Sequence, residues 1–283
     1  MGLQIQDVLR LELLRLVLNP MKDKFFIVFF SLLLSLSNGT LLGQTTLDYD
    51  SRVHPDLAKE YMVVSQNHLA TEAGYQILKQ GGNAIDAAVG VGFVLAVTLP
   101  RAGNIGGGGF MLIYKADSQK VSAIDYRSAA PESSRSEMYL ADSGVVRFGH
   151  LVNAVPGSVA GLIKAHKEHG TLSLRQVLRP AIKFAKLGFP VSYDLNYVLD
   201  WGKDSMLVNE ASKKKFYNNK DKPLQVSSVF KQPNLARTLT LIANKGDQAF
   251  YEGKISDWIV EDSLANGGLI TKRDLAIYEA KDR

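Results

Sequence analysis

The chain has 283 residues, of which 46% are hydrophobic and 22% charged, and this composition excludes collagen, coiled coil and disorder throughout. It contains no cysteine, which excludes disulfides, thiolate zinc sites, iron–sulfur clusters and a cysteine nucleophile. The formal net charge of +5 at pH 7 is a mild basic excess.

Residues 1–20 alternate leucine and valine with arginine and glutamate, as an amphipathic helix does. This pattern is unusual in front of the segment that follows it. Because Met21-Lys22 has the form of the natural start of a signal peptide, we expect translation to begin at Met21. Residues 1–20 are then a doubtful N-terminal extension.

The most hydrophobic stretch of the chain is Phe25–Leu36. Its twelve residues are too few to cross a bilayer as a helix, which takes about 20. A charged start, a short apolar run and small residues after it are typical of a secretory signal peptide. We therefore expect a signal peptide over residues 21–43 and an exported protein, periplasmic or secreted. A buried core helix is the alternative.

Regular structure is expected from about Tyr61 onward. Capping boxes are predicted at Asn83 with Asp86 and at Thr271 with Asp274, and glycine follows most of the predicted helices. The predicted elements are, in chain order, a strand over Met62–Ser65, helices over Ala70–Gln80 and from Asn83 to Leu99, a β-hairpin with strands Phe110–Tyr114 and Val121–Tyr126, and helices over Pro156–His169, Ser173–Leu187, Asn234–Asn244, Lys254–Ala265 and Leu275–Tyr278.

Gly103–Gly109, in front of the hairpin, is rich in glycine and could be taken for a phosphate-binding loop. A P-loop, however, needs Gly-Lys-Ser/Thr and a helix after it, whereas Gly109 is followed by Phe110 and a predicted strand. The run of glycines instead indicates a place where the backbone passes closely under another element.

Arg127 is the best candidate for a binding residue. It stands where the second strand of the hairpin enters the loop Ser128–Pro131. A guanidinium at the end of a strand can bind a carboxylate through two parallel hydrogen bonds. The alternative is a surface ion pair with Asp125 or Glu132.

The histidines do not indicate a metal site. His166 and His169 could share a helix face, but no third ligand is evident, and His169 adjoins the helix-ending Gly170, where an imidazolium complements the helix dipole. The other three histidines lie in loop-like contexts without a G-x-S-x-G motif, so a serine triad is not supported. These are His54, His68 and His150.

The densest basic run is Lys213–Lys215, followed by Lys220 and Lys222. Such a run could follow the phosphates of a nucleic acid. Because no basic stripe accompanies it elsewhere, it indicates a solvated helix end and loop. We expect no nucleic-acid partner.

Seven segments, in order, resemble the N-terminal part of the γ-glutamyltranspeptidase family, and together they cover nearly all of the chain from Tyr61 to Tyr278. They are GGNAIDAAVGVGFVLAVTLP (Gly81–Pro100), GNIGGGGFMLIY (Gly103–Tyr114), DYRSAAP (Asp125–Pro131), VPGSVAGL (Val155–Leu162), HGTLSLRQVLRPAIKFAKLGFPVS (His169–Ser192), QPNLARTLTLIANKGDQAFYEG (Gln232–Gly253) and GGLITKRDLAIY (Gly267–Tyr278).

The resemblance implies an N-terminal nucleophile hydrolase fold, which is an α+β sandwich with two stacked sheets between helical layers (αββα). It implies a precursor that cuts itself into a large and a small subunit, with a threonine at the start of the small subunit as nucleophile. The activity implied is γ-glutamyl transfer to an amino acid, or hydrolysis by water, with glutathione or a related γ-glutamyl amide as donor and without a cofactor. Arg127 matches the arginine that holds the donor's α-carboxylate in this family.

The chain departs from the family pattern at Ser128, where glutamate is usual. A relative that acts on cephalosporin side chains or poly-γ-glutamate therefore stays open. No Thr-Thr-His-like processing site precedes Arg283. We thus expect residues 44–283 to be the front portion of a large-subunit domain, inactive alone, with the nucleophile and the small subunit outside it. An exported noncatalytic protein that binds a carboxylate through Arg127 is the alternative from another class.

Overall fold

The computed structural model describes residues 57–141, 144–145 and 148–283, and Lys59–Arg283 form one compact unit. The signal peptide expected over residues 21–43 and the extension over residues 1–20 lie outside the described residues. No helix within the described part is both long and apolar enough to cross a membrane.

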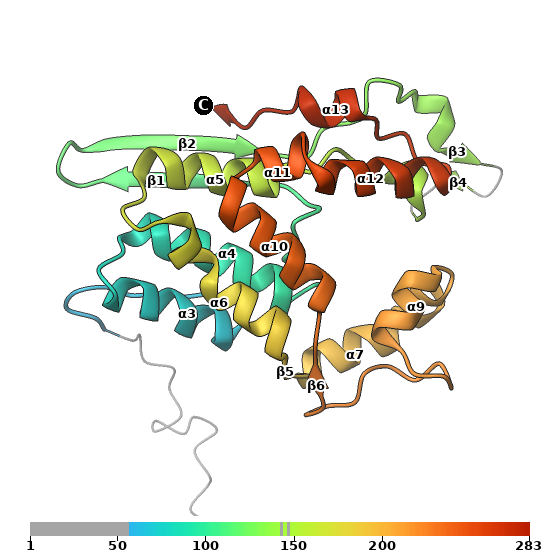
Figure 1. Cartoon of the computed structure of the whole chain (residues 1–283), viewed down its shortest axis with the longest axis horizontal. Coiled ribbons are helices and arrows are strands. Elements are labelled where there is room, and N and C mark those ends of the chain that lie inside the picture. The colour runs from blue at the N-terminus through green and yellow to red at the C-terminus, as the bar shows by residue number, and fades with distance from the viewer. Residues whose placement is uncertain (1–56, 142–143, 146–147) are drawn as a thin grey trace, which may run out of the picture. The chain divides into compact units, whose positions relative to one another are not determined.

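Five helices form a layer in which α4 is central (Figure 1). Helix α4 packs against α3, α5 and α6, and α10 packs against α6. The small and apolar residues of α4 allow it to be buried on several sides. The bounds are His68–Lys79 for α3, Ala84–Thr98 for α4, Ser158–His169 for α5, Leu174–Leu187 for α6 and Pro233–Lys245 for α10.

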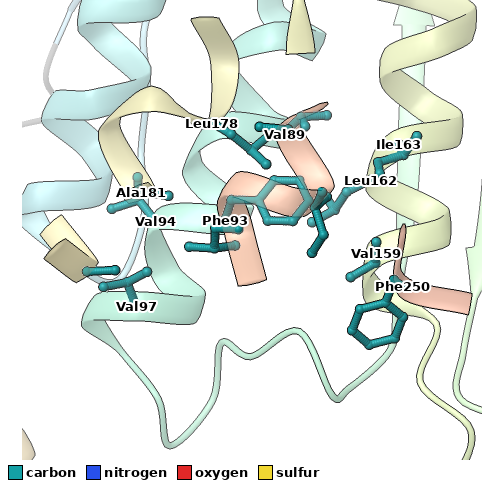
Figure 2. Packing of buried hydrophobic residues seen from close by; sticks show 14 of the residues in the cluster. Val89, Phe93, Val94, Val97, Val159, Leu162, Ile163, Leu178, Ala181 and Phe250 are labelled. Atoms are coloured by element: carbon teal, nitrogen blue, oxygen red, sulfur yellow. The ribbon is translucent and has the colours of Figure 1, made fainter. Parts of the chain in front are cut away.

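The hydrophobic core lies where α4 meets α5 and α6 (Figure 2). Phe93 of α4 is fully buried at its centre. Several fully buried residues of the three helices surround it, namely Val89, Val94, Val97, Val159, Ile163, Leu178 and Ala181. The predicted helices thus exist and share one core.

The predicted hairpin is confirmed as β1 (Gly109–Lys115) and β2 (Lys120–Tyr126), which pair antiparallel from Gly109 opposite Tyr126 to Lys115 opposite Lys120. Strand β7 (Lys281–Asp282) pairs with the other edge of β2. Helix α5 packs against the hairpin. The face bearing Ile113 and Ile124 is buried there, whereas Phe110, Leu112 and Tyr114 of β1 are 67%, 78% and 64% exposed.

The remaining elements complete the described unit. They are the strand pairs β3 (Leu140–Ala141) with β4 (Gly144–Val145) and β5 (Phe189–Pro190) with β6 (Val229–Phe230), the helices α7 (Tyr193–Trp201), α8 (Lys203–Leu207), α9 (Glu210–Phe216), α11 (Gln248–Tyr251), α12 (Lys254–Ala265) and α13 (Lys272–Ala276), and the 3₁₀ helices Ser136–Tyr139 and His150–Val152. Among them, α11 contributes the buried Phe250 to the core.

Several features differ from the sequence prediction. The last helix, expected over Leu275–Tyr278, spans Lys272–Ala276 as α13, because Thr271 caps its start. The strand expected over Met62–Ser65 is wrong, because these residues pair with no strand among the described residues. Helices α7 to α9 were not predicted. They are too short to show a helical period, although two of them begin with a side-chain cap at Ser192 and Asn209.

Candidate functional site

Arg127 is the first residue after β2, where the chain leaves the sheet. Arg127 lines a cavity of about 420 Å³. The cavity is bounded on the other side by residues from the end of the chain, among them Tyr278, Lys281 and Arg283. The predicted place of Arg127 at the end of a strand is thus confirmed.

The guanidinium of Arg127 is not engaged in the surface ion pair considered as the alternative. Asp125 accepts hydrogen bonds from Arg283, and Glu132 accepts one of 2.8 Å from Arg273. The guanidinium of Arg127 contacts only the Ser128 hydroxyl, at 3.3 Å from Nη1 to Oγ, among the hydrogen bonds of the described residues. Arg127 is exposed, and the N–H groups of its guanidinium can donate hydrogen bonds to an external carboxylate.

The backbone of Arg127 is bonded by two side chains. Its N–H donates to Oδ1 of Asp125 at 2.9 Å, and its carbonyl accepts from the Tyr278 hydroxyl at 2.9 Å. The pairing of β1 with β2 ends at Tyr126, one position before Arg127. The N–H and carbonyl of Arg127 therefore have no partner on β1, and the two side chains satisfy them instead.

Two ionisable groups in this arrangement have shifted pKa values. The Arg127 N–H and the Arg283 guanidinium hold the pKa of Asp125 below its ordinary value. Burial, with a further contribution from the charge of Asp125, raises the pKa of Tyr278 to about 12. At neutral pH, Asp125 is therefore an anionic acceptor and Tyr278 a protonated donor.

The glycine loop packs directly against the Arg127 segment. A Cβ on Gly108 would lie 2.4 Å from the Ser128 nitrogen and 2.7 Å from the Tyr126 carbonyl oxygen, so only glycine fits there. The carbonyl of Gly107 accepts hydrogen bonds from the N–H groups of Gly157 and Ser158, at 2.7 and 2.9 Å. These contacts confirm the close approach of backbone inferred from the glycines.

His166 and His169 lie in different surroundings. His166 is hydrogen-bonded through Nε2 to the Leu172 carbonyl at 2.9 Å, and the ring nitrogens of His169 have no hydrogen-bond partner. Within the described ranges, no three His, Cys, Asp or Glu side chains are arranged to hold a metal ion.

The basic run is engaged in local contacts. Lys213 pairs with Asp221 at 3.1 Å, and Lys215 donates to the Lys231 carbonyl at 2.9 Å. The ammonium of Lys215 also lies 5.4 Å from the centre of the Phe230 ring. These contacts fit the end of a surface helix.

Tyr278 and Arg283 carry no local signal of a functional role in the sequence. They lie 151 and 158 positions from the residues to which they bond, Arg127 and Asp125. No local pattern links residues at such separations. The resemblance alone offered a signal for Tyr278, since the residue closes the last matching segment.

The chain matches the family described as Gamma-glutamyltranspeptidase over residues 70–283. It is 43% identical over 235 residues to the glutathione hydrolase proenzyme of Escherichia coli (strain K12), which covers 81% of this chain and 40% of that protein. It is 41% identical over 231 residues to the corresponding proenzyme of Pseudomonas sp. (strain A14), covering 80% of this chain and 40% of that protein. The chain thus spans about two fifths of the length of these relatives.

Solved structures agree with this match and with an α+β fold. The γ-glutamyltranspeptidase of Helicobacter pylori is similar at a TM-score of 0.78 and 40% identity, covering 81% of this chain and 67% of that one. A cephalosporin acylase from Bacillus halodurans is similar at a TM-score of 0.69 and 28% identity, covering 83% of this chain and 46% of that one. On sequence and structure together, the chain belongs to the γ-glutamyltranspeptidase family.

Proposed function

We propose that this chain is the donor-binding front portion of a precursor that hydrolyses or transfers the γ-glutamyl group of glutathione and related γ-glutamyl amides. The observation that carries the proposal is the Arg127 guanidinium, which lines a cavity and has no carboxylate partner among the described residues. Two similar proteins are named glutathione hydrolase proenzymes, which supports glutathione as donor and a precursor as the primary product.

In this proposal, Arg127 binds the α-carboxylate of the donor through both arms of the guanidinium. Such a bidentate pair fixes the orientation of the donor as well as its charge. The γ-amide is then attacked by a threonine that the small subunit supplies from outside this chain, and the acyl group passes to water or an amino acid. The 283-residue chain is therefore inactive alone.

The proposal includes export. It rests on the signal-like segment over residues 21–43, and it places the enzyme in the periplasm or outside the cell. Mass spectrometry of the product made in a bacterium should find a mature chain that begins near Thr40 or Gln44. A soluble cytoplasmic product that retains Phe25–Leu36 would contradict this part of the proposal.

Ser128, the residue after Arg127, favours testing two further donor classes. Ser128 stands where the family usually has glutamate, and the chain is similar to a cephalosporin acylase at 28% identity and to the transpeptidase CapD of Bacillus anthracis at 33% identity. A serine beside Arg127 leaves more room and less negative charge than a glutamate. The complete enzyme should therefore also be assayed with a glutaryl-cephalosporin and with poly-γ-glutamate.

The deciding experiment compares two anilides in the complete precursor. The γ-glutamyl 4-nitroanilide should be hydrolysed at least tenfold more efficiently than 4-aminobutyryl 4-nitroanilide, because the latter lacks the α-carboxylate. Equal efficiencies would contradict the role of Arg127. No turnover of either compound would favour the noncatalytic carboxylate-binding protein. The 283-residue chain, tested in parallel, should release no nitroaniline above a buffer blank, since it lacks the threonine and the oxyanion hole.

A further inference from the structure

We propose that Tyr278 and Arg283 are positioning residues for Arg127, an inference that rests on the proposed role of Arg127 in binding the donor's carboxylate. The side chain of Arg127 is exposed, so packing does not fix the guanidinium. What the structure fixes is the backbone from which the side chain extends. Both backbone polar groups of Arg127 are bonded, and residues from the end of the chain control both bonds.

Tyr278 holds the backbone carbonyl of Arg127 in place. Its hydroxyl donates to the Arg127 carbonyl at 2.9 Å, and its ring stacks on that of Tyr251, with centroids 5.7 Å apart and planes 9° from parallel. The Tyr251 hydroxyl donates to the Pro156 carbonyl at 2.8 Å and accepts from the Ala160 N–H at 3.1 Å. The bond to Arg127 is thus anchored, through two stacked rings, on the first turn of α5.

Gly157 leaves room for this hydroxyl. A Cβ at position 157 would lie 2.1 Å from the Tyr278 oxygen, which is less than any real contact allows. The hydroxyl therefore fills a space beside the α5 backbone that only glycine leaves open. A tyrosine held this tightly can fix the position of the carbonyl to which it donates.

Arg283 acts on the backbone N–H of Arg127 through Asp125. Its Nη2 and Nε both donate to Oδ2 of Asp125, at 2.7 and 3.0 Å, which leaves Oδ1 for the Arg127 N–H. The backbone N–H of Arg283 donates to the Ala123 carbonyl at 2.9 Å. Arg283 is therefore fixed on β2 and orients the carboxylate that holds Arg127.

This control of the backbone matters because two parallel hydrogen bonds to a carboxylate tolerate little displacement. A shift of the Arg127 backbone moves the whole fork relative to the donor. Loss of the Tyr278 hydrogen bond, or of the Arg283 guanidinium that orients Asp125, should weaken donor binding by roughly three- to tenfold. It should affect only donors that carry the α-carboxylate.

The test uses Tyr278→Phe and Arg283→Gln in the complete precursor, with Tyr193→Phe, an exposed tyrosine of α7, as the matched control. Tyr278→Phe and Arg283→Gln should each raise the KM for γ-glutamyl 4-nitroanilide about three- to tenfold and leave kcat within about twofold. The KM for 4-aminobutyryl 4-nitroanilide should not change. The control should match the parent with both donors.

Other outcomes separate this inference from the proposed function. An equal rise in KM for both donors, or a lower Tm with KM unchanged, would mean that Tyr278 and Arg283 serve only stability. If the parent hydrolyses neither donor, the proposed function fails, and hydrogen exchange on the same complete precursor then tests the positioning role. Tyr278→Phe should then speed exchange of the Arg127 and Ala129 amides at least about threefold over the parent and the control. Unchanged exchange would overturn the positioning role.

Discussion

Phe93 of α4 and Phe110 of β1 are the same residue type in two opposite situations. Phe93 is completely buried, whereas Phe110 is 67% exposed. The difference arises because α4 is covered by α3, α5 and α6, while the hairpin is covered by α5 on one face. The helical side around Phe93, here called the closed side, is covered by neighbouring helices. The sheet bears an exposed apolar face, and Arg127 follows its strand β2. Stability and recognition should therefore respond to different substitutions.

The largest expected effect is on the closed side. Phe93→Ala should lower the free energy of unfolding by about 3–5 kcal/mol, because it leaves a cavity among fully buried side chains. The matched substitution Phe110→Ala should change it by no more than about 0.5 kcal/mol, since that ring is largely in water. Urea unfolding of the complete precursor measures both. Equal losses would break the comparison.

The next effect is at the end of the sheet. In the complete enzyme, Arg127→Ala should cost about 2–5 kcal/mol of transition-state binding, or roughly 30-fold to several thousandfold in kcat/KM. Arg127→Lys should recover only part of this, because an ammonium lacks the fork. The Tm should stay that of the parent, since the side chain is exposed. A loss within about threefold for both variants would show that Arg127 is only a surface residue.

Asp86, like Phe93, is a fully buried residue of α4 on the closed side, but it is polar. It is fully buried at the first turn of α4 and accepts hydrogen bonds from Asn83, Thr171 and Leu172. It therefore joins the start of α4 to the loop between α5 and α6. Burial raises the pKa of Asp86, but these hydrogen bonds together outweigh burial and hold the pKa below the ordinary value.

Asp86→Asn should destabilise the chain by about 1–3 kcal/mol at pH 7, because buried donors lose their anionic acceptor. A lowered pKa in the folded state gives stability that is present above the pKa of the unfolded chain and is lost as the pH falls through the folded pKa. The deficit of the variant should therefore shrink below about pH 3.8. Denaturant unfolding at pH 7 and pH 3 measures this, with the exposed Asp204→Asn as control. A deficit independent of pH would contradict it.

The smallest effect on stability belongs to the exposed face of β1. Phe110→Thr and Leu112→Thr should change the free energy of unfolding by less than about 0.5 kcal/mol, because threonine suits a strand and little apolar area is lost from the core. They should, however, reduce aggregation of the isolated chain, which we expect from its open apolar face. Light scattering measures this. A parent chain that is monomeric with one sharp melt would contradict the prediction.

The sequence predicted the features that depend on residues close together in the chain. The predicted capping box at Asn83 and Asp86 is confirmed. It was predictable because its two partners lie within one turn of each other. The place of Arg127 followed from the predicted hairpin, whose second strand ends just before it. The partners of Arg127 did not follow, because Tyr278 and Arg283 reach it only through the tertiary fold. The apolar run Met62–Ser65 was mistaken for a strand because hydrophobicity alone does not supply a neighbouring strand.

The bonds around Arg127 also set an order of assembly. Glu132 bonds to Asp274, Arg127 to Tyr278 and Asp125 to Arg283, across separations of 142, 151 and 158 residues. A chain is synthesised from its amino end, and contacts between distant residues form slowly because long loops must close first. Helices α3 and α4 can pair as soon as they emerge, since they are adjacent in sequence. The bonds of the Arg127 segment must wait for residues 274–283, so this segment is among the last parts of the unit to take its final form.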